Sequence, residues 1–207
     1  MVIEVAVLAV VPWLPLPVPA AVPLLVLAAL SLWLRGKGFA EVGLVATPRA
    51  WPHVAIGVVL GVAAFIASSA LVGPAARLAG LGVDFNHLPP VRDNGSVLLS
   101  ALLLAWAGAA AAEMVFRGYV LDRLAGDLRL SSFTAVLVGA ALYGWALAAG
   151  QDPGQDPGSL ARVAGAALMG VGYGALYFAA GRNLLLPIAF HGAFESTNLL
   201  LLYLRLL

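Results

Sequence analysis

The sequence predicts an all-α integral membrane protein, a bundle of about six to seven transmembrane helices forming one membrane domain over residues 1–207. Apolar residues make up 62% of the chain and charged residues only 10%, against about 45–50% and about 25% in soluble domains. The mean hydropathy of +1.00 reflects apolar residues spread along the whole length. The bilayer is therefore the expected surroundings of the entire chain.

Gly, Pro and charged residues divide the chain into six apolar stretches of roughly the 20 residues that a span needs. The first, residues 2–34, carries prolines at 12, 15, 17, 19 and 23, which are expected to break it into a short and a longer segment. The others cover about 53–71, 96–121, 131–149 and 160–180, and a last stretch that begins after Arg182. A tandem turn, QDPGQDPG at 151–158, separates two of them.

Glycine spacing predicts close helix packing in two of these stretches. Gly57 and Gly61 have GxxxG spacing, which lets helix backbones approach closely in membranes. The fifth stretch carries four glycines that are expected to form a smooth face for its neighbours: Gly165, Gly170, Gly172 and Gly174.

Composition also excludes several classes of site and partner. The chain has no cysteine, which excludes disulfides, thiolate metal sites and cysteine nucleophiles. The net charge is +1 without a long basic run, so no nucleic-acid partner is expected. The expected surroundings remain the lipid bilayer.

Ionisable side chains inside spans are rare, and each is a hypothesis about function. Glu113 and Arg117 lie four residues apart in one span, and His191 and Glu195 lie four apart in another, so each pair shares a helical face. Each pair thus forms a polar stripe on its helix, and Asn198 continues the second stripe one turn further on.

The two polar stripes are expected to lie at the same depth. Glu113 comes ten residues before Arg123, and His191 nine residues after Arg182, which places both about 14–15 Å from the same membrane face at about 1.5 Å per residue. The stripes can therefore meet in a polar site inside the bundle. The alternative is that Glu113 and Arg117 only neutralise each other and stiffen the bundle. His53 and His87 are expected near the interface or in water.

Two motifs carry a resemblance to a known family. The segment AEMVFRGY at 112–119 looks like a first motif EExxxR, and PIAFHGAFE at 187–195 looks like a last motif with a proline before HxxxN or HxxxD. Over about residues 95–200 the chain thus resembles the CPBP family of intramembrane peptidases, which includes the CAAX prenyl endopeptidases and bacterial Abi-type proteins. The resemblance implies a bacterial cytoplasmic membrane as location and a peptide or membrane-tethered protein as substrate.

The resemblance also implies roles for the residues of the two stripes. In the family the leading glutamate activates water, and later histidines with the Asn or Asp stabilise the oxyanion or bind a metal. Glu113 matches the second glutamate, Arg117 the arginine, His191 the last histidine and Glu195 the Asn or Asp position. These four are the candidate catalytic residues.

Further expectations concern the cavity and a metal. Tyr143 and Asn198 are expected to line a substrate cavity. Glu113, His191 and Glu195 could together supply three ligands to a divalent metal such as Zn, with water in an open position.

Two positions depart from the family pattern. Ala112 stands where the leading glutamate is expected, and Leu147 where the middle motif, matched by 143–147, has its histidine. Two functions follow: a divergent endopeptidase that cleaves with activated water, or a pseudopeptidase that binds a membrane-tethered peptide or partner enzyme without cleavage. A small transporter or channel is a third possibility, although no inverted repeat is evident.

Overall fold

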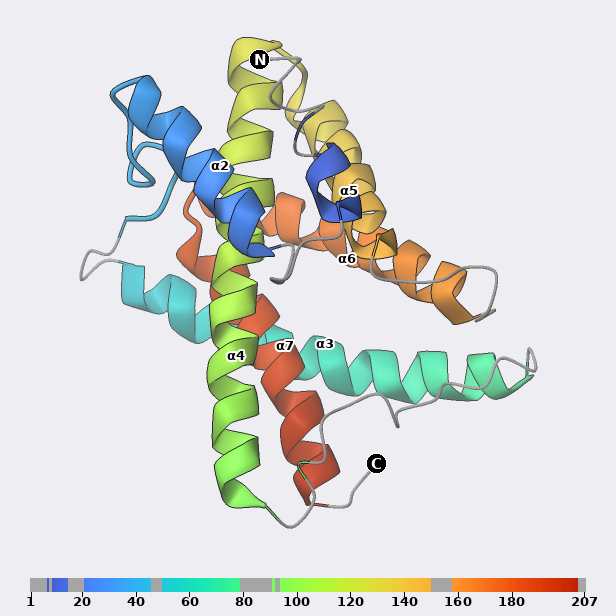
Figure 1. The fold of residues 1–207 in the computed structure, drawn as a ribbon. Coiled ribbons are helices and arrows are strands. Elements are labelled where there is room, and N and C mark those ends of the chain that lie inside the picture. The colour runs from blue at the N-terminus through green and yellow to red at the C-terminus, as the bar shows by residue number, and fades with distance from the viewer. Residues whose placement is uncertain are drawn as a thin grey trace.

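The computed structural model describes residues 7, 9–14, 21–45, 50–78, 91, 94–149 and 158–204. Every regular element within these ranges is a helix (Figure 1), which confirms the all-α prediction. The helices are η1 (Val11–Trp13), α2 (Ala21–Leu34), α3 (Trp51–Leu78), α4 (Gly95–Glu113), the π-helical segments η4 (Met114–Val120) and η5 (Arg123–Asp127), α5 (Ser132–Ala148), α6 (Gly158–Ala179) and α7 (Leu185–Tyr203).

Six apolar helices correspond to the six expected stretches. Among the described residues, three are long and apolar enough to cross a membrane: Trp51–Leu71, Gly95–Asp127 and Leu185–Tyr203. Three are apolar but shorter: Ala21–Leu34, Ser132–Ala148 and Val163–Ala179. The first stretch is broken as predicted, since the short 3-10 turn Val11–Trp13 is followed by the extended residue Leu14, and the next helix among the described residues begins at Ala21. His87 and the tandem turn at 151–157 lie outside the described residues.

The long helix formed by α4 and its π-helical continuation organises the fold. In Figure 1 it runs nearly the full height of the view, with α7 beside its lower half and α3 crossing α7. Helices α5 and α6 pack against each other next to the other half. Asn94 caps the start of α4 by accepting a hydrogen bond from the backbone N–H of Val97, as polar residues before helices commonly do.

Glycines set the closest helix contacts, as their spacing predicted. A Cβ atom on Gly57 would lie 2.5 Å from the carbonyl oxygen of Leu186, and one on Gly61 would meet the carbonyl of Phe190, both on α7. In α6, Gly170 and Gly174 face α5. Gly165 and Gly172 meet nothing within 4 Å, so the smooth face consists of two of the four expected glycines.

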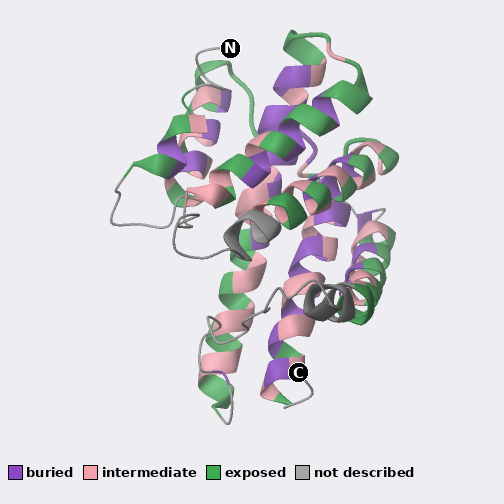
Figure 2. Ribbon diagram, turned by 90° about the vertical axis from the view of Figure 1, so that its right-hand side faces the viewer, coloured by how far each residue is buried: buried purple, intermediate pink, exposed green. Residues whose placement is uncertain are grey.

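Burial is concentrated around the π-helical part of the long helix. All six residues from Val115 to Val120 are buried, whereas residues 95–108 of α4 are exposed or half-buried. Figure 2 shows the same contrast along this helix. The exposed apolar residues of the first part are suited to lipid, and the buried part is where polar side chains can be held away from it.

Candidate functional site

The first polar stripe lies where α4 changes into a π-helix. Glu113 is the last residue of α4, and Arg117 lies in the π-helical segment that follows; such segments are rare and frequently occur at functional sites. Both side chains are almost fully buried, at 0% and 2% exposure. Arg117 Nε lies 3.3 Å from Glu113 Oε2, and Arg117 Nη1 donates to Glu113 Oε1 at 3.3 Å.

Other helices complete the surroundings of the Arg117 guanidinium. Its Nη2 donates to the carbonyl oxygen of Gly170 on α6 at 3.1 Å. Its Cζ lies 4.6 Å from the ring centre of Tyr143 on α5 and 4.8 Å from that of Tyr173 on α6. A desolvated cation over an aromatic ring gains about 2 kcal/mol. The charge is therefore compensated by a carboxylate, a backbone carbonyl and two rings.

The second stripe meets the first through His191, as the equal depths predicted. His191 Nδ1 lies 2.9 Å from Glu113 Oε1, and its Nε2 lies 3.1 Å from Glu195 Oε1. Only an imidazolium donates from both ring nitrogens. The ring also stacks on Tyr173, with centroids 4.7 Å apart and planes 14° from parallel. The imidazole is thus fixed at both edges and on one face.

The two carboxylates differ in how far they are buried. The Glu113 side chain is 0% exposed, while that of Glu195 is 44% exposed. Glu113 is held by both Arg117 and His191. Of these two acidic groups, Glu195 is the one exposed at the surface of the structure.

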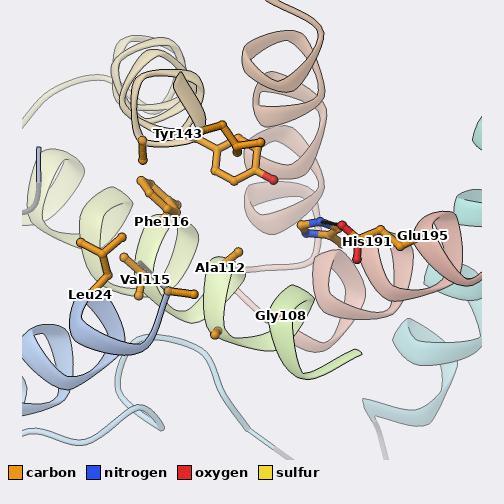
Figure 3. Close-up of a pocket in the computed structure, with 12 residues that line it drawn as sticks. Leu24, Gly108, Ala112, Val115, Phe116, Tyr143, His191 and Glu195 are labelled. Carbon is orange, nitrogen blue, oxygen red and sulfur yellow. Dashed lines mark hydrogen bonds and ion pairs between the residues drawn. The ribbon is translucent and has the colours of Figure 1, made fainter. Parts of the chain in front are cut away.

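A cavity of about 250 Å³ opens beside His191 and Glu195 (Figure 3). Its wall is otherwise almost entirely apolar, with Tyr143 as a further polar residue. Ala112 and Leu147 both line it, so the two positions at which the family pattern has a carboxylate and a histidine face the same space. The apolar lining residues are Ala21, Leu24, Gly108, Ala111, Ala112, Val115, Phe116, Ala146 and Leu147.

The remaining predicted residues are placed as follows. Tyr143 lines the cavity, as expected. Asn198 does not line it: it lies one turn beyond Glu195, half-buried, and its Oδ1 has no hydrogen-bond partner among the described residues, so its role there stays a prediction. Glu113 and Arg117 lie behind the wall and do not line the cavity. His53 is half-buried near the start of α3.

The three predicted metal ligands form a chain instead of a cluster. Among the described residues, no three His, Asp or Glu side chains are arranged to hold one metal ion. The reason is that the two nitrogens of His191 face different carboxylates, whereas a single imidazole nitrogen and both carboxylates must point at a shared ion. Glu113, His191 and Glu195 therefore do not converge on one point in this arrangement, and metal binding there stays a prediction.

Tyr173 was not identified from the sequence, yet it contacts both His191 and Arg117. Its neighbours Gly172 and Gly174 place it in a glycine-rich turn of α6. A tyrosine among small residues, on a helix next to two charged stripes, is the signal that could have indicated it. Scattered aromatic residues in membrane helices are otherwise interpreted as interfacial anchors.

Comparison with known proteins identifies the family. The family model for type II CAAX prenyl endopeptidase Rce1-like proteins matches residues 94–197. Searches of curated proteins and of solved structures give no match. The matched range includes the pairs Glu113–Arg117 and His191–Glu195 and most of the cavity wall. The chain therefore belongs to the type II CAAX prenyl endopeptidase Rce1-like family of intramembrane proteases.

Proposed function

We propose that the protein is an intramembrane endopeptidase that cleaves a peptide bond of a membrane-associated protein or peptide with activated water. The observation that carries this proposal is the cavity at which a partly exposed carboxylate, Glu195, meets an imidazole, His191. A general base must lie within hydrogen-bond reach of the water that it deprotonates. Glu195 meets this requirement better than Glu113, which is fully buried and doubly paired.

The proposed reaction uses the side chains of Glu195 and Tyr143. A water hydrogen-bonded to Glu195 attacks the peptide carbonyl carbon while its proton passes to the carboxylate. The C–N bond then breaks, and the same proton moves from Glu195 to the leaving amine. Tyr143, whose hydroxyl points towards His191 (Figure 3), is the candidate donor to the developing oxyanion.

Glu113 and Arg117 act behind the cavity in this scheme. They do not contact the substrate, because neither lines the cavity. The Glu113 carboxylate fixes the orientation of the His191 ring through Nδ1, and Arg117 holds Glu113 in turn. They are positioning residues.

A second function is supported by Ala112 and Leu147. Both line the cavity and offer no proton acceptor, so the cavity retains its shape with fewer chemical groups than the family motif implies. A pseudopeptidase would use such an apolar cavity to hold a membrane-tethered peptide or a partner enzyme without cleavage.

One experiment tests the proposal. The native protein and Glu195→Gln are reconstituted in liposomes with a panel of prenylated peptides, bacteriocin leaders and sorting-signal peptides, and products are followed by mass spectrometry. We expect product from the native protein and a loss of about 100-fold or more in Glu195→Gln, because loss of a general base costs about 10²–10⁴-fold. Glu41→Gln, which changes an exposed carboxylate in a loop, is the matched control and should cleave normally.

The alternative gives a different pattern in the same assay. A pseudopeptidase binds a peptide of the panel but forms no product, and Glu195→Gln then changes nothing in turnover. Product from Ala112→Glu with Leu147→His, where the native chain forms none, would show that the scaffold is competent and that these two positions removed the chemistry. Equal cleavage by the native protein and Glu195→Gln would refute the role of Glu195.

A further inference from the structure

A second buried arginine lies at the far end of the long helix, and part of its hydrogen-bonding capacity is unused. Arg123 is 1% exposed. Its Nη1 donates to Asp127 Oδ2 at 3.0 Å, and its guanidinium carbon lies 5.1 Å from the ring centre of Tyr119. Its Nε and Nη2 are buried and have no hydrogen-bond partner within the described part of the chain. Buried, unpaired donors on a charged group are costly, so this side of the guanidinium is suited to a ligand.

The unpaired nitrogens have the geometry of an oxyanion receptor. Nε and Nη2 lie on one edge of the planar guanidinium, where two parallel N–H bonds can bind two oxygens of a phosphate or carboxylate. Asp127 pairs with Nη1 and leaves Nε and Nη2 without an anionic partner among the described residues. The same Asp127 oxygen lies 3.5 Å from Arg35 Nη1, and these two side chains are about one-third exposed, at 36% and 34%. Asp127 therefore links Nη1 of the buried Arg123 to the partly exposed Arg35.

The position of Arg123 along the helix matches the depth of lipid phosphates. The apolar helix Gly95–Asp127 has 33 residues, about 50 Å at 1.5 Å per residue, and so exceeds a hydrocarbon core of about 30 Å. With the helix centred on the bilayer at residue 111, Arg123 lies about 18 Å from the midplane. The hydrocarbon ends at about 15 Å, which leaves Arg123 at the level of the headgroups.

Charge at this end of the bundle favours an anion. The described segments that meet at this end of the long helix, residues 35–45, 122–129 and 181–184, carry five basic and three acidic residues: Arg35, Lys37, Arg123, Arg129 and Arg182, with Glu41, Asp122 and Asp127. A net positive group near the membrane surface attracts anionic lipids. We propose that Arg123, with Arg35 at the surface, binds the phosphodiester group of an anionic phospholipid. This site is separate from the peptide cavity.

The test uses the full-length protein in detergent and measures its thermal unfolding with added lipid. Phosphatidylglycerol is compared with phosphatidylcholine at the same mole fraction and with inorganic phosphate alone. We expect phosphatidylglycerol to raise the midpoint of unfolding more than phosphatidylcholine does, and inorganic phosphate to leave it unchanged. In Arg123→Gln the shift specific to phosphatidylglycerol should disappear.

Two further variants make the result decisive. Arg182→Gln removes the same charge at the same end from a side chain that is 50% exposed and pairs with Asp122 at 3.7 Å, and it should keep the shift. Arg123→Lys keeps the charge but loses the two-pronged edge, and native mass spectrometry should show about tenfold weaker binding of one phosphatidylglycerol. This variant decides the question even if Arg123→Gln does not fold.

The other outcomes would overturn the proposal. Equal shifts with both lipids, or full retention of the shift in both Arg123 variants, would mean that Arg123 does not select an anionic lipid. An equal effect of inorganic phosphate would assign the site to a soluble anion instead. Peptide cleavage is not measured in any of these arms, so failure here is distinguishable from failure of the proposed peptidase.

Discussion

Glu113→Leu is the substitution for which the structure gives the most definite energetic prediction. For charges 3.3 Å apart, as between Arg117 Nε and Glu113 Oε2, Coulomb's law at an effective dielectric constant of about 20 gives an attraction of about 5 kcal/mol. Without the carboxylate, Arg117 retains the Gly170 carbonyl and the two tyrosine rings, the rings contributing about 2 kcal/mol. Removing one member of a buried pair costs about 3–5 kcal/mol. We expect Glu113→Leu to lower the free energy of unfolding by about 3 kcal/mol, the lower end of this range, because polar groups also find partners in a chain unfolded within the membrane.

The double variant Glu113→Leu with Arg117→Met separates charge compensation from packing. Replacing a whole buried ion pair by apolar residues is often neutral, whereas His191 Nδ1 loses its partner at a cost of about 1 kcal/mol. We therefore expect the double variant to lose about 1 kcal/mol relative to the native protein and to be more stable than Glu113→Leu. The assay is reversible unfolding in mixed micelles, titrated with SDS and followed by circular dichroism. Glu41→Leu, at an exposed position, should stay within about 1 kcal/mol of the native protein. Additive losses at Glu113 and Arg117, or a stable Glu113→Leu, would refute the reasoning.

Two further predictions concern the packing around the site. Tyr173→Leu removes the ring that stacks on His191 and should lower kcat for peptide cleavage about tenfold, while Tyr173→Phe keeps the ring and should restore most of the rate; equal rates in both variants would contradict a positioning role. Gly61→Ala places a methyl group against the backbone of α7 and should destabilise the protein by about 1–3 kcal/mol. Gly172→Ala, with nothing within 4 Å, should be neutral or stabilise the helix by up to about 1 kcal/mol, and unfolding titrations of both variants check this contrast.

Helix positions were largely predictable from the sequence, because lipid imposes long apolar runs and punctuation marks their ends. The fourth stretch, expected at 131–149, is the helix Ser132–Ala148. The second was expected to end near residue 71 but continues to Leu78, through Pro74 and Arg77. Helix directions were not predictable, because they depend on contacts such as that of Gly57 with Leu186.

The contact between the two polar stripes was predictable, and the fine structure of the site was not. Counting residues from the helix ends placed Glu113 and His191 at one depth, and their side chains lie 2.9 Å apart. The π-helical segment after Glu113 was not predicted from the sequence, and it packs closely on its neighbours: a Cβ atom on Gly118 would lie 3.0 Å from Leu184 Cδ1. Whether His191 contacts one carboxylate or both depends on shifts of its helix by less than one turn.

Charge balance relates the two departures from the family pattern. The present site has two carboxylates, Glu113 and Glu195, against the Arg117 guanidinium and the His191 imidazole. Ala112→Glu alone would add a third carboxylate to an apolar wall, and an uncompensated charge at this depth costs several kcal/mol. Leu147→His on the same cavity wall would supply a group able to compensate it. Loss of an acid together with an imidazole therefore leaves a balanced set, and restoring both should yield more folded protein than restoring the acid alone.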